Sequence, residues 1–166
     1  MGKIKPVPKL RKPLTRKGQK RLADEHEELV KRERPKILDG IATAAAEGDR
    51  SENAEYIYGR KRLRELDKRI RYLNSVLKDA QIIDPELLSG DRVCFGASVV
   101  VLDDKGQEKK WMLVGDGETD YKAGKISWKS PVARALFGKL AGDIVLVNTP
   151  SGESELEILG ITFEDR

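Results

Sequence analysis

The chain has 166 residues, 36% of them charged, and its mean hydropathy is −0.54. No apolar run approaches the ~20 residues that a membrane-spanning helix needs, so we expect a soluble protein without a membrane association. The single cysteine and single histidine exclude an internal disulfide, a Cys/His zinc site and a histidine-based catalytic triad. The basic N-terminus lacks the apolar segment of a secretory signal, so we expect a cytoplasmic protein of one or two domains.

Charge is unevenly distributed along the chain. Residues 1–21 carry nine lysines and arginines and no acid, whereas residues 142–166 have six acids and one arginine. A third segment, residues 59–71, has seven cations and two acids, which gives a net charge of +5. This asymmetry indicates a polyanionic partner.

The first half of the chain predicts two long helices. Residues 1–13 combine prolines with lysines, and we expect a disordered basic arm there. Thr15 is a suitable N-cap, and apolar residues then recur at roughly helical spacing through Glu47: Leu22, His26, Leu29, Ile37, Ile41 and Ala44. Pro35 is expected to kink or divide this helix. We interpret His26 as a packed helix residue.

The second predicted helix, from about Glu52 to Ala80, has the clearest periodicity in the sequence. Its apolar positions are spaced alternately by three and four residues, which is a heptad seam: Tyr56, Gly59, Leu63, Leu66, Ile70, Leu73, Leu77 and Ala80. Because the connection between the helices is short, they must run antiparallel and pair with each other. The sequence therefore predicts a coiled-coil hairpin over residues 14–84 with its tip at residues 48–56.

Four cations occupy successive outer heptad positions of the second helix. They are Lys61, Arg64, Lys68 and Arg71. A solvated helix face is the ordinary interpretation of outer charges, but such faces usually mix the two signs. The uniform sign favours contact with phosphates, which releases counterions. We call these four residues the basic stripe.

After a linker at residues 85–91, the pattern changes to short strands over residues 92–166. We expect strands at about 93–102, 110–114, 125–128, 144–147 and 155–159. Ser130 and Pro131 are a good N-cap and first residue for a short helix through about Phe137. This half predicts a small antiparallel sheet with one short helix, so the fold class is α+β. Cys94 falls in an apolar run and is expected to be a buried, inert thiol.

The tip carries two acids, Asp49 and Glu52, for which two interpretations stay open. Their spacing fits a capping box, in which both side chains satisfy free backbone N–H groups of the second helix. Ionised carboxylates at an exposed tip are also good ligands for Mg²⁺. One carboxylate pair on a bare rod has no pocket, so any catalysis would have to be completed by a partner.

Several stretches carry a resemblance to a known family. The tip Gly48-Asp49-Arg50-Ser51-Glu52-Asn53-Ala54-Glu55-Tyr56 and the following Lys61 to Leu73 resemble the hairpin of the bacterial Gre transcript-cleavage factors, and the basic second helix resembles the GreB branch. Further matches are Glu33-Arg34-Pro35, Phe95-Gly96-Ala97, Val114-Gly115-Asp116, Ser130 to Leu136 and Asn148 to Glu153. The resemblance covers about residues 14–163.

The resemblance implies an N-terminal antiparallel coiled coil and an FKBP-like C-terminal domain without isomerase activity. Such a factor binds RNA polymerase and inserts its coiled coil into the secondary channel. There it stimulates cleavage of RNA whose 3′ end is extruded by backtracking. Asp49 and Glu52 would help to hold a Mg²⁺ ion and its attacking water in the polymerase active site. The factor would not itself be an enzyme, and free in solution it would be a monomer that holds no metal.

The resemblance also assigns the remaining candidate residues. The basic stripe would contact the extruded 3′ end of the RNA. The resemblance also implies a DNA-binding protein. The docking segment would be Ser130, Pro131, Ala133, Arg134 and Leu136, although a helix cap and core packing would equally explain Pro131, Ala133 and Leu136. Two alternatives stay open: a non-catalytic regulator that blocks the polymerase channel, and a prolyl isomerase, which rests on fold similarity alone.

Overall fold

The computed structural model describes residues 9–48 and 53–165. These residues form two compact units. One contains the chain up to Gly18 and again from Asp79 onward, and the other is Gln19–Lys78. The second unit is thus shorter than the predicted hairpin of residues 14–84. In the described parts of the chain, no helix is both long enough and apolar enough to cross a bilayer.

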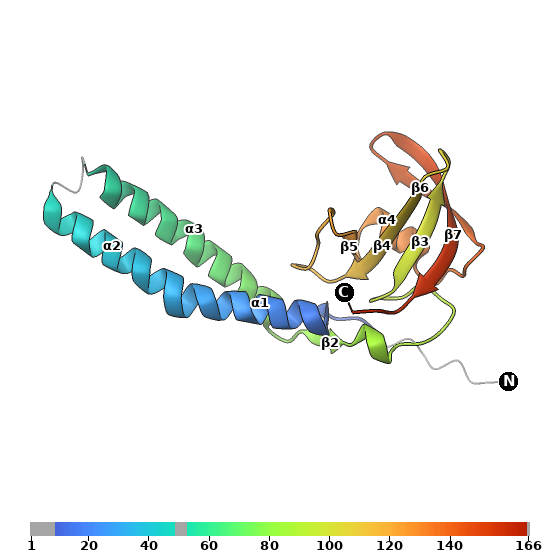
Figure 1. The fold of residues 1–166 in the computed structure, drawn as a ribbon, viewed down its shortest axis with the longest axis horizontal. Helices are drawn as coiled ribbons and strands as arrows, with labels where there is room; N and C mark the ends of the chain where they lie inside the picture. The colour runs from blue at the N-terminus through green and yellow to red at the C-terminus, as the bar shows by residue number, and fades with distance from the viewer. Residues whose placement is uncertain (1–8, 49–52, 166) are drawn as a thin grey trace. The chain divides into compact units, whose positions relative to one another are not determined.

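The helical unit is an antiparallel hairpin, as predicted. Its first limb consists of α1 (Arg16–Glu28), a π-helical turn η1 (Leu29–Glu33) and α2 (Arg34–Glu47), and its second limb is α3 (Ala54–Leu77). The two limbs lie side by side (Figure 1). Every predicted seam position of α3 is buried or half-buried, so the heptad interpretation is confirmed. The helix ends at Leu77, three residues before the predicted Ala80, because Asp79 adopts a left-handed backbone conformation with φ 57°.

The expected interruption near Pro35 takes the form of the π-helical turn. Along the first limb, Leu22, Leu29, Ile37 and Ala44 are spaced by seven, eight and seven residues. A π turn closes i→i+5 hydrogen bonds and so takes up one more residue than an α-helical turn. Because η1 lies within the eight-residue interval, the extra residue is absorbed there and Ile37 and Ala44 are buried again. Pro35 lies in the first turn of α2, where its missing N–H is tolerated.

The other unit is built on a five-stranded sheet of order β5-β4-β3-β7-β6. The strands are β3 (Ser98–Asp103), β4 (Glu108–Val114), β5 (Lys125–Ser127), β6 (Ile144–Thr149) and β7 (Gly152–Thr162). The prediction of an antiparallel sheet was incomplete, because β5 pairs with β4 in parallel and the sheet is therefore mixed. The residues at 93–97, predicted as strand, precede β3 without joining it.

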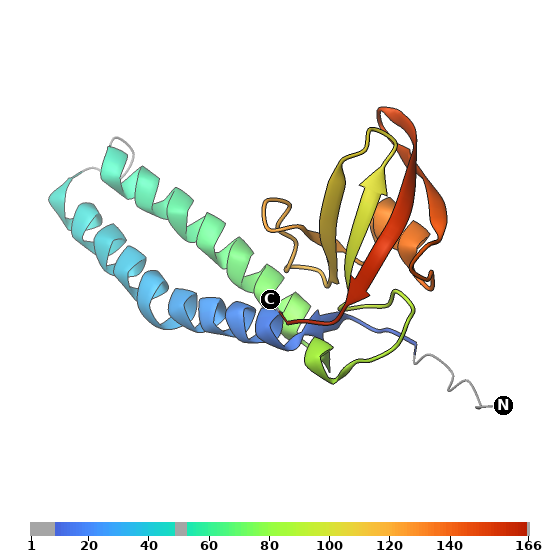
Figure 2. The same ribbon diagram turned by 45° about the vertical axis from the view of Figure 1, so that its right-hand side comes forward.

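One short helix, α4 (Pro131–Leu136), lies against a face of this sheet (Figure 2). Its Ala133 and Leu136 are fully buried in the core together with the inward side chains of the strands. Ser130 caps it by accepting the N–H of Ala133 at 3.2 Å, which confirms the predicted cap. In the same unit, before the five-stranded sheet in sequence, η2 is a single 3₁₀ turn (Pro85–Leu87).

A second, two-stranded sheet joins the beginning of the chain to the globular unit. Strand β1 (Pro13–Thr15) pairs in parallel with β2 (Gln81–Ile83). Thr15 is the predicted N-cap of α1, and its Oγ1 accepts the N–H of Gly18 at 3.1 Å. Pro13 was predicted to belong to a disordered arm, but it is buried within β1, so order begins before Leu14.

The buried carboxylate of Glu118 fixes this junction. Glu118 is 2% exposed and accepts the backbone N–H groups of Thr15 at 3.0 Å and Gly115 at 2.9 Å, and also the hydroxyl of Thr15. No space remains for further atoms, since a Cβ at Gly18 would overlap the Glu118 carboxylate and one at Gly115 would overlap the carbonyl oxygen of Pro13. Glu118 therefore replaces the solvent that would otherwise satisfy these donors.

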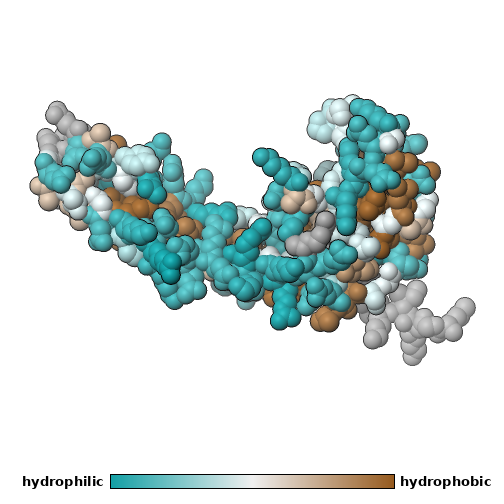
Figure 3. Space-filling model, viewed as in Figure 1, coloured by the Kyte–Doolittle hydropathy of each residue, from teal (hydrophilic) through white to brown (hydrophobic). Residues whose placement is uncertain are grey.

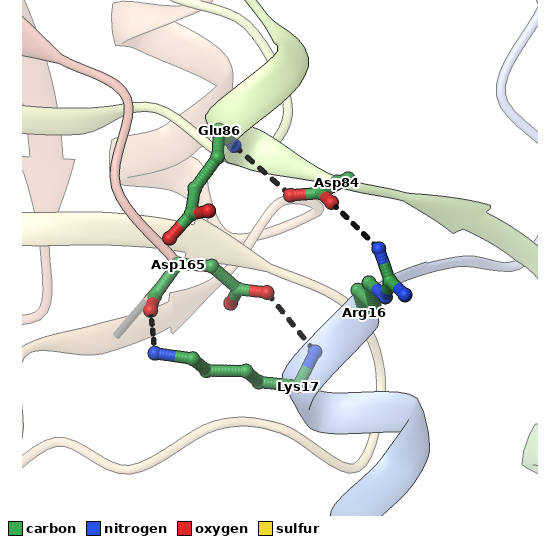
Figure 4. A network of polar contacts seen from close by, with 5 residues as sticks. All are labelled: Arg16, Lys17, Asp84, Glu86 and Asp165. Atoms are coloured by element: carbon green, nitrogen blue, oxygen red, sulfur yellow. Dashed lines mark hydrogen bonds and ion pairs between the residues drawn. The ribbon is translucent and has the colours of Figure 1, made fainter.

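Polar contacts from two other segments reach the first turn of α1 (Figure 4). Asp165, near the C-terminus, accepts the backbone N–H of Lys17 at 3.0 Å, and its carbonyl oxygen accepts the Lys17 ammonium. Asp84 accepts Arg16 at 3.3 Å and the N–H of Glu86 at 3.1 Å. Carboxylates at a helix N-terminus are favourable because the free N–H groups carry partial positive charge.

Candidate functional site: the hairpin tip, the basic stripe and helix α4

The ends of α2 and α3 are held together by one side chain, that of Asn53. Its Oδ1 accepts the backbone N–H of Tyr56 at 3.1 Å, which makes Asn53 the N-cap of α3. Its Nδ2 donates to the carbonyl oxygen of Ala44 at 2.6 Å, in the last turn of α2. A single amide therefore satisfies orphan backbone groups on both helices.

The predicted catalytic and metal-binding residues, Asp49 and Glu52, lie outside the described residues. Among the described residues, the N-cap of α3 is Asn53, and the helix begins at Ala54.

All four side chains of the basic stripe are exposed. None of these side chains forms an ion pair with any residue in the described ranges; the four residues are Lys61, Arg64, Lys68 and Arg71. Two other cations of the hairpin are paired across the limbs. Arg69 binds Glu25 through two hydrogen bonds of 2.7 and 3.0 Å, and Arg34 binds Asp67 at 2.9 Å. The ion pairs thus border the seam, and the stripe retains its charge for a partner.

These pairs shift the titration of their members. The hydrogen bond from Arg69 lowers the pKa of Glu25, against an opposing effect of burial. The hydrogen bond to Asp67 raises the pKa of Arg34. Both pairs join the first limb to α3 and so favour one register between the two limbs.

The predicted docking residues on α4 divide into two groups. Ala133 and Leu136 are in the core, so core packing explains them. Pro131 and Arg134 are exposed, and Ser130 is half-buried as the cap. Only the exposed residues could contact a partner directly.

Sequence reasoning missed a hollow beside α4 of about 290 Å³, lined by Trp128, Lys129, Arg134 and Phe137. The Trp128 ring stands edge-on to Phe95 with their centroids 6.4 Å apart, and the Lys129 ammonium lies 5.5 Å from the Trp128 ring centroid. The available signal was the presence of aromatic residues on both sides of the Ser130-Pro131 cap. The hollow gives the exposed end of α4 an apolar neighbour.

Cys94 is half-buried, and burial raises the pKa of its thiol, which favours the unreactive protonated form. His26 is half-buried on its helix, as a packed residue would be. Within the described ranges, no three His, Cys, Asp or Glu side chains are grouped so that they could hold a metal ion.

The chain matches two family profiles in sequence order. Residues 12–82 match "Transcription elongation factor, N-terminal", and residues 88–163 match "Transcription elongation factor, GreA/GreB, C-term". The chain belongs to the GreA/GreB transcription elongation factor family. The first profile ends within β2, and the second begins directly after η2.

Curated relatives cover nearly the whole chain. Transcription elongation factor GreB of Neisseria meningitidis serogroup B is 46% identical over 151 residues, covering 90% of this chain and 93% of that protein. Transcription elongation factor GreA of Brucella anthropi is 46% identical over 153 residues, covering 91% and 97%. GreA of Xanthomonas axonopodis pv. citri is 42% identical over 158 residues, covering 94% and 100%. Identity places the chain in the Gre family and does not separate the GreA branch from the GreB branch.

Among solved structures, GreA factor homolog 1 (Gfh1) of Thermus thermophilus is 27% identical with a TM-score of 0.39 and covers 90% of this chain and 97% of that one. A GreA/GreB factor from Nitrosomonas europaea is 21% identical with a TM-score of 0.40, covering 91% and 98%.

Proposed function

We propose that this Gre-family chain acts in the cytoplasm as a GreB-like factor that stimulates RNA polymerase to cleave the extruded 3′ end of RNA in backtracked complexes. The hairpin would enter the secondary channel and bring Asp49 and Glu52 to the polymerase active site. The observation that supports the proposal is the capping of α3 by Asn53, because this helix then needs no cap from Asp49 or Glu52.

The residues available at the tip fit a divalent ion that is shared with a partner. Carboxylates are the ligands that Mg²⁺ prefers, and the ion is commonly bound by one or two of them plus water and phosphate. Bound there, Mg²⁺ would supply an activated water and neutralise charge on the phosphodiester. Asp49 and Glu52 would orient the ion, and Asn53 would hold the two helix ends that carry the tip in fixed geometry.

The other surfaces have supporting roles in this proposal. The basic stripe would bind phosphates of the extruded RNA, since its charges are exposed and lack intramolecular ion pairs among the described residues. The exposed Pro131 and Arg134 of α4 would dock on the polymerase. Hydrolysis would remain the polymerase's reaction, which this chain completes.

The test is a cleavage assay on a backtracked complex with Asp49→Ala and Glu52→Ala. Losing one ligand of a shared metal ion is expected to slow cleavage by about 100-fold, equivalent to roughly 2.7 kcal/mol, and to leave polymerase binding within about twofold. Glu47→Ala is the matched control, because Glu47 is an exposed acid in the last turn of α2. Full cleavage by both tip variants would refute the proposal. Inhibition of elongation by the wild-type chain without cleavage would identify a channel-blocking regulator instead.

A further inference from the structure

A groove opens between the two limbs of the hairpin about two helical turns from the ends of α2 and α3. Its volume is about 310 Å³, and its floor is formed by Ile37 and Ile41 of α2 with Gly40 and Gly59. Apolar side chains come to the surface in a band between the helices there, on an otherwise hydrophilic face of the hairpin (Figure 3). This volume is at the small end of the range for ligand-binding clefts.

The two glycines at the floor have different explanations. A Cβ at Gly59 would lie 2.8 Å from Cγ1 of Ile41, so Gly59 permits close packing of the limbs. A Cβ at Gly40 would meet no atom within 4 Å. Glycine inside a helix costs about 1 kcal/mol relative to alanine, so Gly40 destabilises α2 without any packing reason. Gly40 lines the groove, so a large side chain at this position would reduce the groove's volume.

The wall on α3 is suited to stacking. Tyr58 is 62% exposed, and Cζ of Arg62 lies 5.9 Å from the centroid of its ring. An exposed aromatic face beside an arginine is the combination on which single-stranded nucleic-acid sites are built, with about 1–3 kcal/mol per stacked base. At this exposure, most of the Tyr58 side chain is accessible to a ligand.

The charged lining of the groove has both signs. Lys36 of α2 and Arg62 of α3 can bind phosphate, while Glu33 and Glu55 can accept hydrogen bonds from base amino groups or ribose hydroxyls. The groove overlaps the segment of α3 that has a net charge of +5, residues 59–71, and the exposed basic stripe lies in the same segment. The surroundings thus attract a polyanion, and the lining offers partners for a nucleotide's polar groups.

We propose that this groove binds one unpaired nucleotide of single-stranded RNA, with the base stacked on Tyr58 and a flanking phosphate at Arg62 and Lys36. The inference rests on the proposed function, because that function supplies the extruded strand. The groove assigns Tyr58 to strand binding, in addition to the stripe.

The experiment places 4-thiouridine at successive positions of the extruded RNA in a backtracked complex and maps ultraviolet crosslinks on the chain. A crosslink within the α3 segment around Tyr58 is expected. Gly40→Phe, which fills the groove without removing a charge, and Tyr58→Ala should each lower that crosslink and the rate of RNA cleavage by about tenfold. Tyr58→Phe should retain both, because the stacking ring remains.

Two matched controls isolate the groove. Gly40→Ala leaves most of its volume, and Tyr72→Ala removes the other exposed tyrosine of α3 that has an arginine over its ring, 5.3 Å away for Arg69. Both controls should behave as wild type. Equal crosslinking by Gly40→Phe and Gly40→Ala, crosslinks outside the groove, or no crosslink to the wild-type chain would each overturn the inference. A groove crosslink without stimulated cleavage would uphold the groove and refute the cleavage function instead.

Discussion

Asn53 and Ala44, nine residues apart on opposite limbs of the hairpin, are joined by a 2.6 Å hydrogen bond from the amide of one to the carbonyl of the other. The same Asn53 side chain caps α3. Removing it in Asn53→Ala should lower the free energy of unfolding of the hairpin by about 1–2 kcal/mol, since a cap is lost and a carbonyl loses its partner.

The measurement is a denaturant titration followed by helical circular dichroism. Asn53→Asp should recover part of the loss, because a carboxylate keeps the cap but cannot donate to Ala44. The matched control is Asn74→Ala, an exposed asparagine inside α3, which should be neutral or slightly stabilising. Equal effects of Asn53→Ala and Asn74→Ala would mean that the tip does not depend on this bond.

The basic stripe should control the length of RNA that the factor can act on. Neutralising Lys61, Arg64, Lys68 and Arg71 together to glutamine is expected to shorten the released fragments without abolishing hydrolysis. The logarithmic salt dependence of binding to the backtracked complex should fall by roughly 3, at ~0.7 per phosphate contact of a single strand. Fragment lengths resolved on a gel measure the first effect, and binding titrations at several salt concentrations measure the second.

The control variant removes four exposed cations from the globular unit: Arg11, Lys105, Lys110 and Lys122. It changes the net charge equally, so a general electrostatic effect would appear in both variants. The RNA-contact assignment requires the stripe variant alone to shorten the fragments.

Two glycines within the helices should respond to alanine in opposite directions. Gly18→Ala places a Cβ inside the Glu118 carboxylate and should destabilise the globular unit by more than about 2 kcal/mol. Gly40→Ala meets nothing and should stabilise the hairpin by about 0.5–1 kcal/mol. Chemical denaturation of the two variants decides this, and effects of the same sign would contradict the described packing.

The Glu118 carboxylate should be needed for its charge as well as its shape. Glu118→Gln keeps the size but directs an NH₂ group against donors from Thr15 or Gly115. We expect a loss of about 2–3 kcal/mol, as for a buried donor left unsatisfied. Thermal unfolding monitored by tryptophan fluorescence reports on this unit, because both Trp111 and Trp128 lie in it. Glu153→Gln, at an exposed position of β7, serves as the control and should change little.

The Glu25–Arg69 pair makes hairpin stability depend on acid pH. Because the pKa of Glu25 is lowered in the folded state, its contribution is present above the ordinary pKa of glutamate and disappears as pH falls through the lowered value. The pair is partly exposed, so its contribution is under about 1 kcal/mol. Arg69→Gln should therefore reduce stability at neutral pH and have no effect at the acid end. An equal loss at both ends would exclude this linkage.

Periodic features were predictable from the sequence, and isolated contacts were not. The α3 seam follows from one hydrophobic residue every three or four positions, and the Thr15 cap and the Ser130 cap follow from local chemistry. The burial of Glu118 was not predictable, because a single acid in a Gly- and Asp-rich loop is typical of a solvent-exposed position. The β1–β2 pair was missed because three-residue strands have no measurable periodicity and their partners are 68 residues apart.

The start of α3 shows why the spacing of a capping motif does not by itself locate the first residue of a helix. Asp49 and Glu52 have capping-box spacing, but Asn53 is an equally good cap, and the sequence does not state where α3 begins. The structure places that beginning at Ala54. Helix boundaries depend on which of several competing caps wins, and here the bond to Ala44 favours Asn53.

The π-helical turn has a consequence for how the hairpin can change in length. In a regular α-helix, deleting one residue rotates everything beyond it by about 100° and turns the buried stripe away from its partner. At Leu29–Glu33 the chain already contains one residue more than the heptad requires. A single deletion there would convert the π turn to α-helix and leave Ile37 and Ala44 facing α3. The first limb can thus lose one residue at this point and keep each of its cations on the same side of the hairpin. A deletion elsewhere along α1 or α2 would move the cations beyond it to another side.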